Sequence, residues 1–294
     1  MPHSYTPVAK NPKDLISILF EIFLKLNSSR PEVIPLDIKK IDAKTSLNIG
    51  IFKGYSFQRP ADVIVKRIDN SAQILKKNGH NIIELEPPNF EEIYFLFFGI
   101  FNPCIMKKIQ DLSDENSTNC SLIPNIYSRS GFSKCFNYYY WKILNSSPFK
   151  ANFATKTGLI STYDFSILCK KRTLFLKNYV KYLMDLKIDI ILCPTFPVAS
   201  PPKEIADEFF FGNVYCVFST FIGFPSGVVP TKKVDLEDQY YRNDANLKNE
   251  FEFRYNLAMK KSLRCPLGLQ VIGFPYNEEN ILRIMNELFE LSND

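Results

Sequence analysis

Histidine and cysteine, the side chains that most often bind metal ions or assist a nucleophile, are sparse in this chain. The sequence holds two histidines, His3 and His80, and seven cysteines. No two cysteines have the C-x-x-C spacing, and no cysteine–histidine group has the spacing of a zinc site. The sequence also lacks a glycine-rich phosphate loop. We therefore expect no metal and no cofactor.

A cysteine nucleophile needs a base within reach. Cys193 ends an apolar run and could face a cleft, but neither histidine lies beside a recognisable orienting acid. We therefore interpret Cys193 as a core residue, as free cysteines usually are. His80 follows Gly79 at a predicted helix-to-strand turn, and we interpret it as structural or solvated.

Paired carboxylates could divide general acid and general base work between them. The pairs Glu91-Glu92, Glu237-Asp238 and Glu278-Glu279 each lie at an apparent helix start. Negative charge at that position complements the helix dipole. We interpret these pairs as helix-start charges, so residue types alone yield no catalytic constellation.

The first element that the pattern predicts is a helix over residues 11–26. Asn11 can cap it, Pro12 suits its first turn, and Asp14 adds favourable charge there. Its apolar residues fall on one predicted face. These are Leu15, Ile18, Leu19, Ile22, Phe23 and Leu26.

A β-α-β unit follows in fewer than 45 residues, with strands at 46–55 and 81–85 and a helix at 60–78 that Gly79 ends. Such a unit is typical of a parallel sheet. The predicted stripe of its helix is Val63, Ile64, Ile68, Ala72 and Leu75.

The rest of the chain continues the alternation of helices and strands, with strands that are hydrophobic throughout or nearly so, as in sheets covered on both faces. The sequence therefore predicts an α/β fold, with helices on both sides of a mixed, mainly parallel sheet. Further predicted helices are 89–112, interrupted at Pro103, then 161–186, a polar helical stretch over 234–263, and 277–291; further strands are 188–197, 224–230 and one from Cys265; residues 113–150 are irregular.

The composition indicates a globular protein, with 46% hydrophobic residues and a mild net charge of +5. Lysine and arginine are scattered, which argues against nucleic acid. No apolar run reaches the ~18 residues of a spanning helix, and no secretory signal opens the chain. We expect an intracellular protein, cytoplasmic or peripheral on internal membranes.

Several blocks together resemble the amidase-signature family, in particular its fatty-acid amide hydrolase branch. CPLGLQVIG resembles the closing strand of that family, FPSGVVP resembles its F-P-A-G-V-V-P block, and IDIILCPTFP its D-x-x-L-x-P strand. The matches are collinear over residues 5–291, which leaves 1–4 and 292–294 as tails. The resemblance implies the C-terminal portion of a single amidase domain, an incomplete amidase-signature fold.

The family hydrolyses carboxylic and lipid amides with a Ser-Ser-Lys triad in a Gly/Ser-rich block. This chain has eleven glycines, and its serine pairs Ser28-Ser29 and Ser146-Ser147 lack glycine-rich surroundings. No triad residue carries over, so we expect an N-terminally incomplete chain that is inactive alone. The alternative is a non-catalytic paralogue that binds lipid or a partner protein.

The resemblance implies two substrate-channel residues. Phe101, in GIF, matches a family segment whose phenylalanine lines the acyl channel, and Tyr276 matches an aromatic channel position. Ordinary packing is the alternative for both. Asp235 stands where the family has threonine, which argues against a fully apolar wall there.

The implied partners are a lipid-amide-like small molecule and a membrane surface. Residues 133–149 mix aromatics with lysines, as interfacial segments do. A buried aromatic patch remains the alternative for this segment.

Overall fold

The computed structural model describes residues 7–30, 33–55, 58–113, 160–203, 209, 212–242 and 250–290, and the side chains of all of these except 102–113 and 250. The chain divides into two compact units. The first unit consists of Met1–Pro87 and Leu183–Asp294 and holds the sheet, and the second is Pro88–Tyr182.

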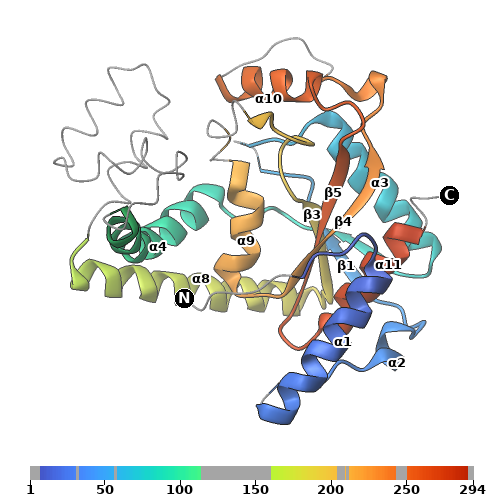
Figure 1. The fold of residues 1–294 in the computed structure, drawn as a ribbon, viewed down its shortest axis with the longest axis horizontal. Coiled ribbons are helices and arrows are strands. Elements are labelled where there is room, and N and C mark those ends of the chain that lie inside the picture. The colour runs from blue at the N-terminus through green and yellow to red at the C-terminus, as the bar shows by residue number, and fades with distance from the viewer. Residues whose placement is uncertain are drawn as a thin grey trace. The chain divides into compact units, whose positions relative to one another are not determined.

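A five-stranded sheet with the order β2-β1-β3-β5-β4 forms the centre of the first unit (Figure 1). β1 pairs in parallel with β2 and β3, whereas β5 pairs antiparallel with β3 and β4. All strands except β5 therefore point the same way, which confirms the predicted mixed, mainly parallel sheet. The strands are β1 (Asn48–Ile51), β2 (Asn81–Glu84), β3 (Ile190–Pro194), β4 (Ser226–Lys233) and β5 (Pro266–Gly273).

The predicted β-α-β unit is present. Helix α3 (Asp62–Lys77) connects β1 to β2, and Gly79 follows its C-terminus with a φ of 93°. The whole predicted apolar stripe of this helix is buried, because the helix packs on the sheet against β2 and β3. These residues are Val63, Ile64, Ile68, Ala72 and Leu75.

Helices cover both faces of the sheet. On one face α11 (Glu278–Glu290) packs so closely that a Cβ on Gly273 would lie 2.8 Å from Cγ1 of Ile281. On the other face Gln270 of β5 bonds Ser219 of α9 (Val214–Ile222). Gln270 and Gly273 lie three residues apart on one strand and so point to opposite faces. This confirms the predicted three-layer arrangement, visible in Figure 1 as α9 on one side and α3 and α11 on the other.

The described part of the stretch 234–263 is less helical than predicted. It holds a short 3-10 helix, η2 (Leu236–Asp238), and helix α10 (Glu250–Lys260). Between them, Tyr241 takes its backbone partners from distant segments. Its N–H donates to Asn256 Oδ1 at 3.4 Å, and its carbonyl accepts from Asp62 N–H at 2.9 Å. Because tertiary contacts use these groups, the backbone there does not close a helical ladder.

Helix α1 (Pro12–Ser29) begins as predicted, with the Asn11 side chain accepting the Asp14 N–H at 2.8 Å. Its predicted face is only partly correct. The side that packs combines Leu15, Leu19 and Phe23 with Ile16 and Phe20, against a cluster of Leu36, Ile41 and Leu282 near the short helix α2 (Ile38–Ile41). The packed face of α1 is therefore rotated relative to the predicted face. Three residues of the predicted face are exposed: Ile18, Ile22 and Leu26.

Two long helices dominate the described part of the second unit, α4 (Phe90–Ser113) and α8 (Thr162–Asp185), whose last three residues belong to the first unit. The predicted interruption at Pro103 is wrong, since α4 is one continuous helix. Proline costs a helix one backbone hydrogen bond, and the buried turns from Ile93 to Ile100 outweigh that loss.

Among the described helices, none is both long and apolar enough to span a bilayer. The predicted irregular segment 113–150 lies almost wholly outside the described residues.

Candidate functional site

The carboxyl ends of β1 and β3 are where the sheet topology favours a site. The chain leaves β1 for β2 on one side, and β3 lies on the other side of β1. In open α/β sheets, ligands bind outside the carboxyl ends of the strands at such a switch point. The residues there are Phe52–Tyr55 after β1 and Thr195–Val198 after β3. Farther along the loop that follows β1, the Ala61 N–H donates to the Pro197 carbonyl at 2.8 Å and so joins the two segments.

Buried tyrosines hold the segment that follows β1. The hydroxyl of Tyr215, on α9, accepts the Tyr55 N–H at 3.1 Å and donates to the Gln58 carbonyl at 2.5 Å. The Tyr255 hydroxyl, on α10, donates to Gln58 Oε1. Tyr241 donates to the Arg59 carbonyl at 2.6 Å. We call these four tyrosines with Gln58 the tyrosine cluster.

Burial fixes the chemistry that the cluster can perform. It raises the pKa of Tyr215 and Tyr255 well above the usual value and raises that of Tyr241 as well. The phenols therefore stay protonated near neutral pH and act as hydrogen-bond donors, because burial disfavours the charged phenolate. They position the loop at the switch point and do not serve as bases.

We expect Tyr215→Phe to lower the free energy of unfolding by about 1–3 kcal/mol, because the Tyr55 N–H and the Gln58 carbonyl would lose their buried partner. Urea unfolding followed by circular dichroism measures the change. Tyr276→Phe is the matched control, since Tyr276 is 74% exposed, and it should change stability by less than about 0.5 kcal/mol. Equal stability of Tyr215→Phe and the native chain would contradict this role.

Three buried polar atoms near this edge have no hydrogen-bond partner among the described residues: Gln58 Nε2, Thr195 Oγ1 and Gln270 Oε1. Gln270 Nε2 donates to Ser219 Oγ at 2.9 Å, and Ser219 donates onward to the Cys216 carbonyl at 3.2 Å. That chain of bonds fixes the Gln270 amide with its oxygen unmatched. Buried polar atoms are normally paired, so each of these three atoms retains the capacity for one further hydrogen bond.

Among the described residues, no serine or cysteine forms a hydrogen bond with the side chain of a histidine or a lysine. Ser161 donates to the Asp164 carboxylate at 2.8 Å, but this exposed pair caps the start of α8. Cys193 is buried in β3, and burial raises the pKa of its thiol well above the usual value, which confirms its interpretation as a core residue. Ser28 and Ser29 donate to the carbonyls of Lys25 and Leu26 at the end of α1. Ser146-Ser147 and His3 lie outside the described residues.

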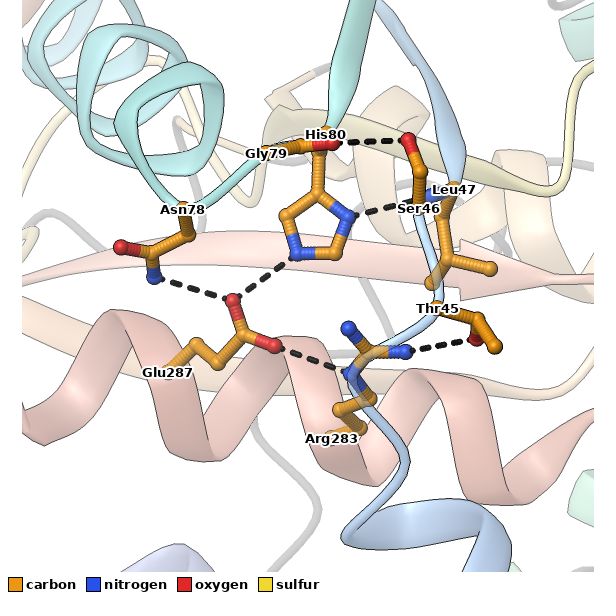
Figure 2. Close-up of polar contacts among 8 residues, drawn as sticks. All are labelled: Thr45, Ser46, Leu47, Asn78, Gly79, His80, Arg283 and Glu287. Carbon is orange, nitrogen blue, oxygen red and sulfur yellow. Dashed lines mark hydrogen bonds and ion pairs between the residues drawn. The ribbon is translucent and has the colours of Figure 1, made fainter.

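His80 belongs to a second polar cluster, away from the switch point (Figure 2). Its side chain is 1% exposed, and its Nδ1 accepts the Leu47 N–H at 3.2 Å. Nδ1 therefore carries no proton, and Nε2–H donates to Glu287 Oε2 at 2.9 Å. The imidazole is thus structural, one of the two roles predicted for it.

The Glu287 carboxylate, on α11, is the shared hydrogen-bond acceptor of this cluster. Asn78 Nδ2 and Arg283 Nε each donate to its carboxylate at 3.0 Å, and Arg283 Nη1 reaches Thr45 Oγ1 at 3.2 Å (Figure 2). The cluster therefore ties the end of α3, the approach to β1 and α11 together. Each polar side chain of the cluster has a partner inside the fold, so we assign this cluster to stability.

The two predicted channel residues lie in different units. Phe101 is half-buried on α4, where its ring stacks on Phe97 with centroids 5.0 Å apart. Tyr276 lies in the turn after β5 with a φ of 65° and is 74% exposed. Asp235 forms an exposed ion pair with Lys232. A channel role for Phe101 and Tyr276 stays a prediction.

The acidic pairs lie at helix starts as predicted, in the first turns of α4, η2 and α11. Glu279 also has a tertiary partner, because its Oε1 accepts the Asp37 N–H at 3.0 Å. No group of three or more His, Cys, Asp or Glu side chains within the described ranges is arranged to hold a metal ion.

Sequence reasoning identified neither the tyrosine cluster nor the partners of His80. Tyr215 bonds a residue 160 positions away, and Tyr255 bonds one 197 positions away. The only local signal was Gly54 at the end of the predicted strand. Its φ of 145° and its close approach to Pro60 and Tyr215 require a residue without a side chain there.

Comparison with known proteins places these features in context. The family model described as Amidase matches residues 6–282. The chain is 22% identical over 307 residues to fatty acid amide hydrolase 1 of Caenorhabditis elegans, covering 96% of this chain and 50% of that protein. It is 21% identical over 300 residues to fatty-acid amide hydrolase 1 of Sus scrofa, covering 98% and 51%. The chain thus spans about half the length of the curated relatives it matches.

Solved structures share the fold. A fatty acid amide hydrolase superposes with a TM-score of 0.66 at 20% identity, covering 97% of this chain and 47% of that one. An allophanate hydrolase of Kluyveromyces lactis gives a TM-score of 0.52 at 15% identity, covering 84% and 32%. At these identities the likeness establishes the fold alone.

Proposed function

Because this chain belongs to the amidase family, we propose that it forms part of a hydrolase that cleaves lipid amides. The observation that carries the proposal is the family match over residues 6–282 together with two curated relatives that are fatty acid amide hydrolases. The three-layer fold supports the reaction class, and the names of the relatives support the lipid amide as substrate.

We further propose that the 294 residues do not catalyse this reaction alone. Amide hydrolysis by a serine enzyme needs a nucleophile, a proton-transfer partner and oxyanion donors. The sequence contains no Gly/Ser-rich block that could supply them. Among the described residues, Ser161 donates to the Asp164 carboxylate, but the two residues form a capping pair at the start of α8. In this proposal the chain contributes sheet, helices and substrate-contacting surface, including Phe101 and Tyr276.

The purified 294-residue chain should neither hydrolyse an oleoyl amide nor react covalently with a fluorophosphonate probe. Loss of a nucleophile removes most of the rate of such an enzyme. Intact-mass measurement after probe treatment and product detection by chromatography test this. A fatty acid amide hydrolase treated in parallel is the positive control. Stoichiometric labelling of one serine in the chain would overturn the proposed inactivity.

The substrate class is tested separately. A chain that presents lipid-amide-binding surface should bind oleoyl ethanolamide more tightly than acetamide in equilibrium binding, whether or not it turns either over. Equal or absent binding of the two amides would count against the lipid amide and leave the family assignment untouched.

The alternative is a non-catalytic chain that binds lipid or a partner protein. The observation that favours it is that no described serine or cysteine forms a hydrogen bond with the side chain of a histidine or a lysine. Sequencing the 5′ end of the transcript separates the two proposals. Upstream coding sequence with a Gly/Ser-rich block supports the hydrolase, and a start codon at Met1 supports the non-catalytic chain.

A further inference from the structure

The turn between α3 and β2 contains the pair Asn78-Gly79, and no other asparagine of the sequence precedes a glycine. Asparagine is one of the thermally labile residues, because the backbone nitrogen of the next residue can attack its side-chain carbonyl. A following glycine leaves that nitrogen unshielded, since glycine has no Cβ. Both residues are exposed, and nothing lies within 4 Å of a Cβ built on Gly79. Water and hydroxide therefore reach this peptide bond from the surface.

The reaction open to this pair needs no reactant except water. The Gly79 nitrogen loses its proton to hydroxide and bonds to Cγ of Asn78, while the Cγ–Nδ2 bond breaks. The departing nitrogen takes a proton from water and leaves as ammonia, which restores the hydroxide. Water then opens the cyclic imide that has formed, so that aspartate or isoaspartate stands in place of Asn78.

Hydrogen bonds occupy both reacting groups in the folded chain. Asn78 Nδ2 donates to Glu287 Oε2 at 3.0 Å, which directs the side-chain amide toward α11 (Figure 2). The Gly79 N–H donates to the Lys76 carbonyl at 3.1 Å. Ser46 fixes the same turn, because its hydroxyl donates to the Gly79 carbonyl at 2.7 Å. Attack on Cγ therefore requires that the amide leave Glu287 and that the Gly79 nitrogen leave Lys76.

We propose that Asn78 is a site of spontaneous deamidation, that its bond to Glu287 slows the reaction, and that the product carboxylate breaks the Glu287 cluster. This cluster consists of Glu287 and the side chains that donate to it, those of Asn78, His80 and Arg283. The proposal does not depend on the amidase reaction.

The product would oppose the cluster in two ways. A carboxylate at position 78 replaces a donor by an acceptor beside Glu287, so two negative charges would repel each other. The new charge would also lie at the C-terminus of α3, where the helix dipole disfavours negative charge. One slow chemical event would thereby weaken the tie between α3 and α11.

Peptide mapping of the 294-residue chain during incubation at mildly alkaline pH measures the conversion of each asparagine. Asn78 should convert slowly in the folded chain and should be the fastest asparagine to convert in urea. Glu287→Ala should speed its conversion by on the order of tenfold, because a hydrogen bond to a charged group is worth about that factor in an equilibrium. Glu287→Gln, the milder variant, should speed it less, since a neutral oxygen is a weaker acceptor.

The matched control is Gly54→Ala, which destabilises the same unit by pressing on Pro60 but leaves the bond between Asn78 and Glu287 in place. Urea unfolding gives the unfolded fraction of each variant, and this fraction multiplied by the rate in urea is the conversion due to unfolding. Gly54→Ala should convert at that rate, and both Glu287 variants should exceed it. If neither Glu287 variant exceeds it, the bond does not slow the reaction and the proposal is wrong.

Asn78→Asp tests the effect of the product. It should lower the urea midpoint more than Asn78→Ala, which removes the same hydrogen bond without adding a charge. In a Glu287→Gln background this excess loss should shrink, because one of the two repelling charges is gone. Equal midpoints for Asn78→Asp and Asn78→Ala in the native background would overturn the claim that deamidation breaks the cluster.

Discussion

Replacing Glu287 with alanine is expected to lower the free energy of unfolding of the first unit by about 3–5 kcal/mol. The substitution removes the carboxylate that accepts from His80, Asn78 and Arg283. Arg283 is only 6% exposed, so its charge would stay buried with Thr45 as its remaining partner. A buried charge left without its counter-ion costs far more than a surface pair. Urea unfolding followed by circular dichroism measures the loss.

Glu290→Ala is the matched control on the same helix. Glu290 pairs with Lys13 at 2.8 Å, but both side chains are more than half exposed, so the loss should be at most about 1 kcal/mol. If both variants lose the same stability, the Glu287 cluster does not have the role that its burial implies.

The pH dependence of stability provides a second, independent test of the role of Glu287. Burial raises its pKa, but the hydrogen bonds from Asn78 and His80 and the nearby Arg283 outweigh burial and hold the pKa below its usual value of 4.5. A carboxyl with a lowered folded-state pKa stabilises the fold in full above the unfolded value and loses that contribution as the pH falls through the folded value. The stability gap between the native chain and Glu287→Gln should therefore be constant near neutral pH and shrink below pH 4.5.

The second large effect is expected for Gly54→Ala, which should lower the free energy of unfolding by about 3–5 kcal/mol. Gly54 has a φ of 145°, which side chains rarely adopt, and a Cβ there would press on Pro60 and lie 2.9 Å from the Tyr215 hydroxyl oxygen. Backbone strain and displacement of the tyrosine cluster therefore add together. We expect the near-ultraviolet circular dichroism of the buried tyrosines to weaken along with the unfolding midpoint.

Gly79→Ala separates these two contributions. Gly79 also has a positive φ, 93°, but nothing lies within 4 Å of an added Cβ. Gly79→Ala should lower the free energy of unfolding by about 1–2 kcal/mol, through backbone strain alone. It should leave the near-ultraviolet circular dichroism of the tyrosines unchanged. Equal costs at the two glycines would show that the close approach of Gly54 to Tyr215 is easily relieved.

Local pattern was enough to predict most elements of this chain. The Asn11 cap, the β-α-β unit with its buried stripe and the strand that contains Cys193 were all predicted correctly, because capping, periodicity and turn chemistry act over a few residues. Pattern failed where a tertiary contact decided the outcome. Pro103 is held within α4 by buried turns, and Tyr241 interrupts a predicted helix because Asp62 and Asn256 bind its backbone.

The sequence by itself determined the family and the three-layer class, because these depend on short motifs and on the alternation of helices and strands. Only the tertiary structure decided which distant groups meet. His80 bonds Glu287 across 207 positions, and Tyr255 reaches Gln58 across 197. Strand order and helix packing set such encounters, and no local pattern encodes them, because a side chain's partner depends on which elements the fold places beside it.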